Sequence, residues 1–511
     1  VSILISVLII CCKKETIISN GDFISFSVDT LMFDTVFTTI GSATRYVKIY
    51  NNYNTDINIK NIKLEQEQNS SFKINIDGEA NYNITNTLLR ARDSMYIFTE
   101  VTIDPNNLNQ PIIETDAIVF SYENQVQKIN LVAWGRDAYF HSGIPDHQQY
   151  SPQSENLASM EYCDFYATFG IDCPEEYIGE SFNYYSVDEH TTWTNDKPHV
   201  IYGNLIVEKG AILTMQAGSE IYLHNNSSLL VSSASSIHAN GTINNLIWFQ
   251  SDRSDSHSLT DYANTPGQWG KIWILPGSVN NIFNYAILKN GQTGIQIDGV
   301  DDIATLPIEP TLTLKNSIIY NMSSIGLFAQ GSRVHGENLL MFNCGQHLLA
   351  LNTGGAYRFQ HCTFANFWPF SRQTPSIFLN NYYTDIDGNI QNRDLLEASF
   401  ENCIIDGNNE TEIIFDKSDH AMFNYKLDYC ILKSSEDYWQ NNWQNAISEN
   451  VNLLINNATT GFINYEINDF QLDSNSIALD IGSTIIAKDV PYDLNGINRL
   501  TNPDIGCFEK Q

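Results

Sequence analysis

Basic residues are scarce in this chain of 511 residues, which has 27 Lys and Arg against 59 Asp and Glu. The formal net charge of −32 opposes binding to phosphate backbones and to anionic lipid surfaces. We therefore expect no nucleic-acid partner. The acidity itself is typical of a soluble, exposed protein surface.

Several catalytic motifs are also missing. The 11 histidines include no His-Glu-x-x-His arrangement, and the sequence has no Gly-rich phosphate loop, Gly-x-Ser-x-Gly elbow or Cys-x-x-Cys pair. These absences remove support for metalloprotease, nucleotide-dependent and esterase functions. No resident cofactor or metal is predicted from motifs.

Cysteine is sparse, and the nine cysteines suggest neither a disulfide framework nor a metal-ligand pattern. Cys163 and Cys173, ten residues apart, form the one pair that we expect to be a disulfide in an oxidising compartment. Cys362, Cys403 and Cys430 share one position of a repeat described below. We expect these three to act as small buried apolar side chains.

Residues 1–10 form a largely apolar run that is too short to span a bilayer but has the length of a secretory signal core. The run ends at Cys11-Cys12-Lys13 and there resembles a bacterial lipobox. That resemblance implies cleavage before Cys12 and lipid attachment to it, with residues 1–21 as the signal and anchor segment. A buried strand is the alternative interpretation.

A short phrase recurs with variation between residues 283 and 435. Its six copies are Asn284-Tyr-Ala-Ile-Leu-Lys-Asn290, Asn316-Ser-Ile-Ile-Tyr-Asn321, Asn338-Leu-Leu-Met-Phe-Asn343, His361-Cys-Thr-Phe-Ala-Asn366, Asn402-Cys-Ile-Ile-Asp-Gly407 and Tyr429-Cys-Ile-Leu-Lys-Ser434. The shortest steps between copies are 22 and 23 residues, which is too short for paired helices. The short β-branched runs bounded by Asn and Gly predict one turn of a parallel β-helix per copy.

The reference position of each copy is Ala286, Ser317, Leu339, Cys362, Cys403 or Cys430. This residue and the one two positions later should share a face, because side chains alternate along a strand. The residue between them is also apolar in most copies, so alternation alone leaves open which set is buried. Four copies carry Asn four residues after the reference, at Asn290, Asn321, Asn343 and Asn366, which predicts a stacked asparagine ladder or, alternatively, ordinary turns.

The rest of the chain also indicates strands. Residues 22–138 contain short alternating segments at the spacing of a small Ig-like β-sandwich. Residues 139–196 lack sustained periodicity and are interpreted as a connecting segment. A denser strand series predicts the β-helix over 197–469, and residues 470–511 are well placed to cap it. The expected fold is therefore all-β, with an N-terminal β-sandwich, a right-handed parallel β-helix and a short C-terminal cap.

Several segments together resemble the surface lipoproteins of Bacteroidota that carry a right-handed parallel β-helix of the pectate-lyase-like kind. They are the Cys12-Lys13-Lys14 start and residues 29–42, 101–105, 207–215, 266–270 and 503–509. The resemblance implies this fold and an address at the outer membrane, exposed at the cell surface. It implies no catalytic residues, because the function of the family is undefined and fold alone supplies no reaction.

The long insertion between the copies at Cys362 and Cys403 is the predicted place for a glycan-binding site. Aromatic rings in it can stack on sugars, and its carboxylates can bind a cation or act as acids and bases. The candidates are Trp368, Tyr382, Tyr383, Asp385, Asp387 and Asp394. Calcium is a weak option, because residues 384–389 only partly match a calcium loop and Asp-Gly is a common turn.

Three functions remain open. The first is a non-catalytic, lipid-anchored envelope protein that binds a polysaccharide or another extracellular macromolecule along a face of the β-helix. The second is a polysaccharide lyase or glycoside hydrolase, with Arg333, Arg358 or Arg393 as the available basic residue of a lyase. The third is a structural adhesin. A groove that gathers rings, a basic residue and paired carboxylates would favour the enzyme.

Overall fold

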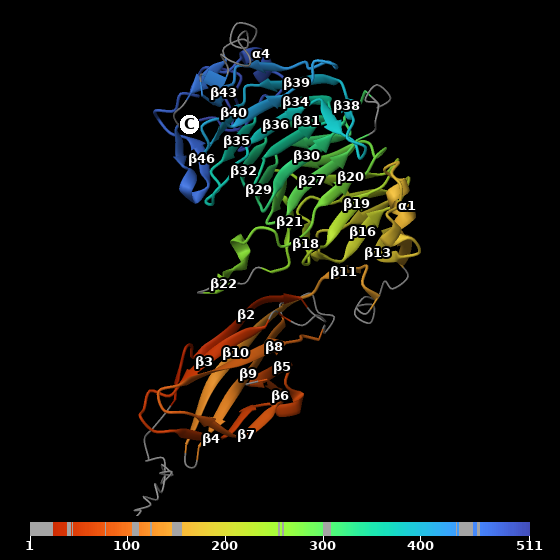
Figure 1. The fold of residues 1–511 in the computed structure, drawn as a ribbon. Helices are drawn as coiled ribbons and strands as arrows, with labels where there is room; N and C mark the ends of the chain where they lie inside the picture. The colour runs from red at the N-terminus through yellow and green to blue at the C-terminus, as the bar shows by residue number, and fades with distance from the viewer. Residues whose placement is uncertain are drawn as a thin grey trace, which may run out of the picture. The chain divides into compact units, whose positions relative to one another are not determined.

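The computed structural model describes residues 24–510 except 38–41, 43, 77, 105–111, 123–124, 146–155, 254–255, 258–259, 300–307, 436, 439–452 and 457–459. The chain divides into two compact units, Val1–Asp137 and Ala138–Gln511. Each unit has its own hydrophobic core and consists mostly of strands (Figure 1). The lipidation residue predicted from the sequence, Cys12, lies outside the described residues.

The first unit is a β-sandwich of two five-stranded sheets. One sheet has the order β1 (Ser25–Phe26), β3 (Arg45–Tyr50), β8 (Ser94–Val101), β5 (Phe72–Ile76) and β6 (Glu79–Ala80). The other has the order β2 (Thr30–Phe37), β10 (Val126–Arg136), β9 (Ile112–Ser121), β4 (Ile57–Leu64) and β7 (Asn83–Leu89). Burial alternates along β3, where Val47 and Ile49 enter the core, as expected for a sheet with one solvated face.

The second unit is a parallel β-helix with three long sheets, which confirms the predicted fold class (Figure 1). The eleven-stranded sheet contains β11 (Tyr139–Ser142), β15 (His199–Tyr202), β18 (Glu220–Leu223), β21 (Ile247–Ser251), β26 (Ala286–Lys289), β29 (Ile318–Met322), β32 (Leu340–Cys344), β35 (Thr363–Asn366), β40 (Ile404–Gly407), β43 (Ile431–Lys433) and β44 (Leu454–Asn456). The ten-stranded sheet contains β12 (Leu157–Glu161), β13 (Ser181–Val187), β16 (Asn204–Val207), β19 (Ser228–Val231), β24 (Ile272–Ile274), β27 (Thr293–Asp298), β30 (Ile325–Gln330), β33 (Leu349–Asn352), β36 (Ile377–Asn380) and β41 (Ile413–Asp416).

The nine-stranded sheet completes each turn. It contains β14 (Thr191–Trp193), β17 (Ile212–Met215), β20 (Ser236–Asn240), β25 (Asn281–Asn284), β28 (Leu312–Lys315), β31 (Arg333–Glu337), β34 (Gly355–Gln360), β39 (Leu395–Glu401) and β42 (Lys426–Asp428). The sandwich also contains the short helix η1 (Glu67–Asn69). The β-helix unit contains further short elements between its main strands, namely α1 (Tyr162–Ala167), η4 (Glu175–Tyr177), β22 (Ser256–His257), β23 (Thr260–Asp261), η5 (Tyr262–Asn264), β37 (Tyr382–Thr384) and β38 (Ile390–Asn392).

The β-helix begins earlier than the sequence indicates. Within the predicted connecting segment 139–196, β11 pairs with β15, β13 with β16 and β14 with β17, all in parallel. These strands already form part of the first turn of the β-helix. The periodicity is hidden because the strands are short and because α1 and its loop interrupt them.

The repeat occupies the strands of the eleven-stranded sheet, and the structure settles which of its residues face inward. The reference residues and those two positions later are buried in the interior of the β-helix, from Ala286 and Leu288 to Cys430 and Leu432. The residues between them, such as Leu340 and Ile404, belong to a separate apolar cluster on the outside of the same sheet. Both sets are apolar because the first packs in the interior of the β-helix and the second packs in the cluster on the outside of the sheet.

A left-handed corner lies near the start of every copy of the repeat. The residue just before the reference has φ between 48° and 54° in all six copies, at Tyr285, Asn316, Asn338, His361, Asn402 and Tyr429. Asn tolerates this conformation better than most side chains, which explains its recurrence. Its amide also stacks: Asn316 Nδ2 donates to Asn284 Oδ1, and Asn338 Nδ2 donates to Asn316 Oδ1, both at 2.9 Å.

The predicted asparagine ladder is therefore displaced from its expected position. Among the four predicted residues, Asn321 Nδ2 donates to Asn290 Oδ1 at 2.8 Å, which forms one rung. Asn343 instead bonds to Asn468, and the Asn366 side chain exchanges two hydrogen bonds with the backbone of Cys344. The sequence pattern identified the residue type correctly but placed the main stack at the wrong end of the strand.

The C-terminal segment lies along the outer face of the eleven-stranded sheet. It contains β45 (Phe462–Asn464), η7 (Tyr465–Ile467), β46 (Asp469–Leu472) and α4 (Thr484–Ala487). Its apolar side chains pack on outward residues of the sheet, for example Phe470 on Phe342 with ring centroids 4.8 Å apart. Its backbone is bonded to the corner residues, since Asn338 Nδ2 donates to the Tyr492 carbonyl at 2.8 Å.

The predicted cap at 470–511 thus covers a side of the β-helix across several of its turns. Hydrogen bonds join it to Asn338, Thr363 and Asn402, which belong to different turns. This position explains why the outward residues of the repeat are apolar.

Candidate functional site

A groove of about 500 Å³ lies on the outer face of the ten-stranded sheet. Its floor comes from β24, β27 and β30, through Trp273, Gln296, Asp298 and Gln330. One wall is the segment from Phe165 to Ile171, and the other is formed by Tyr383 and Arg393 at the β37–β38 hairpin.

The first wall is held by a disulfide. Cys163 and Cys173, the pair expected from the sequence, are joined with an S–S distance of 2.04 Å, and they close the loop that carries Phe165, Tyr166, Phe169 and Ile171. The rings of Phe165 and Phe169 each lie 5.5 Å from the ring of Trp273, measured between centroids. Because a cross-linked loop loses little further entropy on binding, this wall is preorganised.

A polar network covers the floor of the groove and is centred on Asp298. Gln330 Nε2 donates to Asp298 Oδ1 at 2.7 Å, Gln296 Nε2 donates to both carboxylate oxygens at 3.1 Å, and Trp273 Nε1 donates to Oδ2. Lys271 Nζ donates to Gln296 Oε1 at 2.7 Å and lies 3.9 Å from the centroid of the Trp273 ring. Burial lowers the pKa of Lys271, and the charge of Asp298 opposes that shift.

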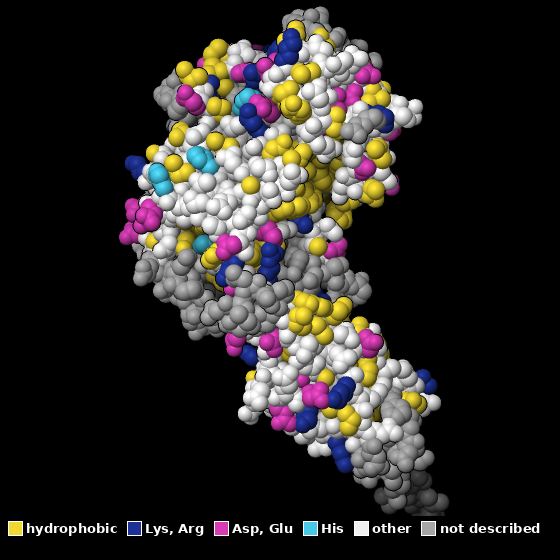
Figure 2. All heavy atoms as spheres, turned by 180° about the vertical axis from the view of Figure 1, so that it is seen from behind, with side chains coloured by type: hydrophobic (Ala, Val, Ile, Leu, Met, Phe, Trp, Pro, Cys, Tyr) yellow, Lys and Arg dark blue, Asp and Glu magenta, His cyan; other side chains and the backbone are white. Residues whose placement is uncertain are grey.

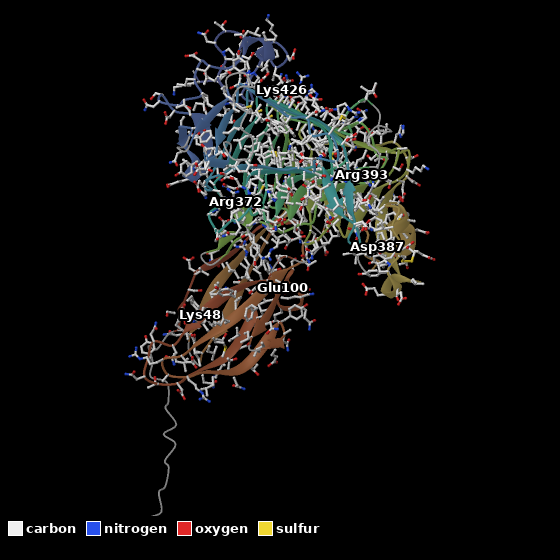
Figure 3. All side chains as sticks on the ribbon, turned by 45° about the horizontal axis from the view of Figure 1, so that its top comes forward. Lys48, Glu100, Arg372, Asp387, Arg393 and Lys426 are labelled. Carbon is white, nitrogen blue, oxygen red and sulfur yellow. A yellow bond between two sulfur atoms is a disulfide. The ribbon has the colours of Figure 1, made fainter. Side chains whose placement is uncertain are left out.

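The second wall comes from the insertion that the sequence singled out. Arg393 Nη2 donates to the Tyr383 hydroxyl at 3.1 Å, and the guanidinium carbon lies 5.1 Å from the centroid of the Tyr383 ring. Arg393 Nη1 also donates to the Asn392 carbonyl at 3.0 Å. In Figure 3 Arg393 and Asp387 lie at the same hairpin, and Arg372 lies apart from both.

The six predicted glycan-binding residues do not form one cluster. Tyr383 lines the groove, and Tyr382 donates through its hydroxyl to Asp416 Oδ2 at 2.7 Å. Trp368 is only 8% exposed and packs against Phe370, outside the residues that line the groove.

The three predicted carboxylates lie outside the residues that line the groove. Asp385 accepts hydrogen bonds from the Gln391 side chain and from the backbone of Asn389, and these bonds lower the pKa of its carboxyl group. Asp394 Oδ1 accepts from the Met422 backbone at 2.9 Å, and Asp387 is exposed. Residues 384–389 therefore form a hairpin turn, and no group of three or more His, Cys, Asp or Glu in the described part of the chain is arranged to hold a metal ion.

Sequence reasoning missed most of the groove. The recognisable repeat marks only the strands of the eleven-stranded sheet. The floor of the groove comes instead from strands of the ten-stranded sheet, which carry Trp273, Gln296, Asp298 and Gln330. One signal was present in the sequence. Gln296 and Asp298 are two positions apart on β27, and Phe328 and Gln330 are two positions apart on the neighbouring strand β30. Outward pairs at this spacing stack once the register is known.

The outer face of the nine-stranded sheet carries charged side chains that are paired with one another. Glu401 accepts from Arg358, Gln360 and Lys426 at 2.7–3.2 Å, and Glu337 lies 3.0 Å from Lys315. Burial raises the pKa of both glutamates, but Lys426 and Arg358 beside Glu401, and His335 and Lys315 beside Glu337, lower it below the usual value. In the view of Figure 2, acidic and basic side chains are interspersed rather than gathered in one patch. Arg358, a candidate base of a lyase, thus belongs to an ion-paired face.

Comparison with known proteins gives no family. No family model matches the chain, and no curated protein matches it. Solved structures that share partial likeness include a PapD-like domain of human CEP192 (10% identity, TM-score 0.17, covering 27% of this chain and 99% of that domain). They also include a family 123 glycoside hydrolase from Clostridium perfringens (10% identity, TM-score 0.16, covering 25% of this chain and 29% of the hydrolase).

A protein of unknown function from Porphyromonas gingivalis W83 is a third such structure (10% identity, TM-score 0.17, covering 27% of this chain and 62% of that chain). TM-scores this low carry no argument about the function of the chain. The described residues contain no helix with the length and apolar character needed to cross a membrane.

Proposed function

We propose that this protein binds carbohydrate in the groove on the ten-stranded sheet, without chemical conversion of the sugar. One observation carries the proposal: aromatic rings from three separate segments of the chain, Phe169, Trp273 and Tyr383, line the same groove as the hydrogen-bonded network around Asp298. Sites for small molecules typically combine apolar rings with a few fixed polar groups.

The two kinds of side chain suit the two kinds of sugar surface. The C–H face of a pyranose packs on an aromatic ring, and its hydroxyls donate to carboxylates or exchange hydrogen bonds with amides. Asp298 and the amides of Gln296 and Gln330 supply both donors and acceptors at fixed positions. Because their neighbours already hold these groups in place, binding costs little side-chain ordering.

The enzyme alternative has one supporting observation, which is that Arg393 lies in the groove beside the Tyr383 hydroxyl. Glycosidases, however, use two carboxyl groups that flank the scissile bond. Asp298 is the one carboxylate among the described lining residues, and it accepts hydrogen bonds from three neighbours. Binding is therefore the better supported function.

The test is a glycan array followed by calorimetric titration of the glycans that bind. Trp273→Ala and Tyr383→Ala should each weaken binding about tenfold, because a stacked ring contributes roughly 0.5–1.5 kcal/mol in addition to the burial of its area. Phe370→Ala removes an exposed ring outside the groove and should leave affinity unchanged. The proposal fails if no glycan binds or if the control weakens binding equally.

A product assay separates binding from catalysis. Each glycan that binds is incubated with the full chain, and new reducing ends and unsaturated products are measured. We expect neither to appear above the level of a protein-free control. Unsaturated product that disappears in Arg393→Ala would replace binding with a lyase reaction.

We also propose that Cys12 carries a lipid that holds the protein at the cell surface. The support is the apolar run at residues 1–10 followed by Cys12 and two lysines. Detergent-phase partitioning of the protein expressed in a bacterial host should be lost in Cys12→Ala and kept in Cys11→Ala. Retention of the Cys12→Ala variant in the detergent phase would contradict the anchor.

A further inference from the structure

The groove continues into two rows of side chains on the outer face of the ten-stranded sheet. Strand pairing stacks outward residues from β24, β27, β30, β33, β36 and β41 in register. The first row is Trp273, Gln296, Phe328, Ala350, Phe378 and Ile414. The second row is Asp298, Gln330, Asn352, Asn380 and Asp416.

The two rows run side by side because their members are two residues apart on each strand. The first row is mainly apolar, with three aromatic rings, and the second consists of amides and carboxylates. Adjacent strands lie about 4.8 Å apart, so six strands extend roughly 24 Å along the β-helix axis. Each row is therefore several times longer than a single sugar ring.

Neighbouring groups fix the orientation of the second row at both ends. Gln330 donates to Asp298 at 2.7 Å at the groove end. At the other end Asn380 Oδ1 accepts from the Thr353 backbone at 2.7 Å, and Asp416 accepts from the Tyr382 hydroxyl at 2.7 Å. Tyr382 belongs to the same hairpin as Tyr383, so one insertion touches both the groove and the far end of the row.

We infer that the groove is one end of a longer strip, Trp273 to Asp416, that binds an extended, uncharged polysaccharide running along the β-helix axis. This inference rests on the proposed function. The strand spacing is close to the length of one pyranose in an extended chain, so the strip takes roughly five consecutive sugars, one for each step between strands. The first row packs on the C–H faces and the second row bonds the hydroxyls.

Charge and sheet geometry exclude other occupants. Lys271 and Arg393 at the groove end offset the carboxylates of Asp298 and Asp416, so it is the net charge of −32 that disfavours a polyanion such as a polyuronate. A peptide that adds a strand needs an open sheet edge, whereas the strip lies on the face of a sheet whose inner strands are paired on both sides. An uncharged chain of hydroxyls and C–H faces matches both rows.

The test measures affinity against chain length, using cello-, xylo- and manno-oligosaccharides from the disaccharide to the octasaccharide in calorimetric titrations. For the series that binds, affinity should rise from the disaccharide to about the pentasaccharide and then level off. Phe378→Ala and Asn380→Ala should each weaken hexasaccharide binding about tenfold and leave the disaccharide unchanged. Trp273→Ala should weaken both lengths.

The outcomes separate the strip from the groove. Equal affinity for short and long chains, or an unchanged hexasaccharide affinity in both Phe378→Ala and Asn380→Ala, overturns the strip and leaves the groove intact. Indifference of every length to Trp273→Ala overturns the proposed function itself. Tighter binding of oligogalacturonates than of every neutral series overturns the uncharged ligand. Thermal melting of each variant checks that it is folded.

Discussion

The outer faces of the eleven-stranded and ten-stranded sheets belong to the same β-helix turns but have opposite surroundings. On the eleven-stranded sheet the C-terminal segment covers Leu340, Ile404 and Ile431, which are at most 4% exposed. On the ten-stranded sheet Trp273 and Phe378 remain half-buried beside a row of amides and carboxylates. Strand geometry is the same in both, so the covering segment accounts for the difference.

The comparison shows how to interpret outward residues of a β-helix. A continuous apolar row with no polar partner indicates that another part of the chain covers it, because exposed apolar strips of that size are rare on soluble proteins. Rings mixed with amides and carboxylates indicate a face that stays in water and meets a polar ligand. Three predictions about protein stability test this distinction between the two faces.

The largest effect should come from a matched pair of phenylalanines on the two faces. Phe342 packs between Tyr320 and Phe470 under the C-terminal segment, whereas Phe378 is half-buried on the ten-stranded sheet. Phe342→Ala should lower the free energy of unfolding by about 3–5 kcal/mol and Phe378→Ala by about 1 kcal/mol, as measured by urea denaturation. Equal losses would remove the distinction between the covered face and the open face.

A smaller effect should come from the corner that leads into the covered sheet. Asn316 has φ of 48° and makes two side-chain bonds to the amides of Asn284 and Asn338. Asn316→Ala should cost roughly 2–3 kcal/mol, because alanine loses both bonds and strains the left-handed backbone. Asn316→Gly should cost about half as much, because glycine adopts that φ freely.

A control isolates the backbone contribution to that loss. Asn502 has a similar φ of 47° but is exposed, so Asn502→Ala should cost about 1 kcal/mol. Thermal or urea denaturation of the three variants should give the order Asn316→Ala, Asn316→Gly, Asn502→Ala from the largest loss to the smallest. A Gly variant as unstable as the Ala variant would assign the whole effect to the amide stack.

The third prediction is a pH dependence of stability that arises on the covered face. Burial raises the pKa of Glu509 from 4.5 to about 8, although Arg499 Nε lies 3.4 Å away and opposes this shift. Between these two values the folded chain keeps a proton that the unfolded chain has lost. Stability should therefore fall as pH rises through this window.

Glu509→Gln is the matched variant for that prediction, since it keeps a carbonyl acceptor for the Asp504 backbone N–H. Its denaturation midpoint should fall less than that of the wild type between pH 4.5 and 8. Parallel profiles for the two proteins would show that Glu509 does not titrate in this range. Glycan binding on the open face should not follow the same pH dependence.

Much of the fold could be predicted from the sequence because the copies of the repeat show which strand positions are equivalent in successive turns. The six copies gave the turn length and the all-β class, and Cys362, Cys403 and Cys430 are buried as expected, but which of the two apolar sets faces inward stayed open. The boundary of the β-helix was missed because the strands between Tyr139 and Trp193 are separated by a disulfide-closed loop. Local pattern cannot show that separated short strands join one sheet.

The candidate site was predicted only in part. The insertion supplies Tyr383 and Arg393, and the predicted disulfide shapes the opposite wall. Trp368 was predicted to lie in the site because it belongs to the insertion. It is buried outside the groove instead, since a large apolar ring is stabilised where neighbouring residues cover it. Trp273 and Asp298 are 25 residues apart in sequence, and only strand pairing between neighbouring turns brings them into hydrogen-bond contact.

The sequence by itself determined the periodic part of this protein: the strands, their left-handed asparagine corners and the two apolar sets of each repeat. These features follow from local sterics and from alternation along a strand, which each copy restates. Only the tertiary structure decided which outer face the C-terminal segment covers and which stays open with its rings and amides. That choice depends on contacts between residues more than a hundred positions apart, such as Asn338 with Tyr492, and no local pattern encodes them.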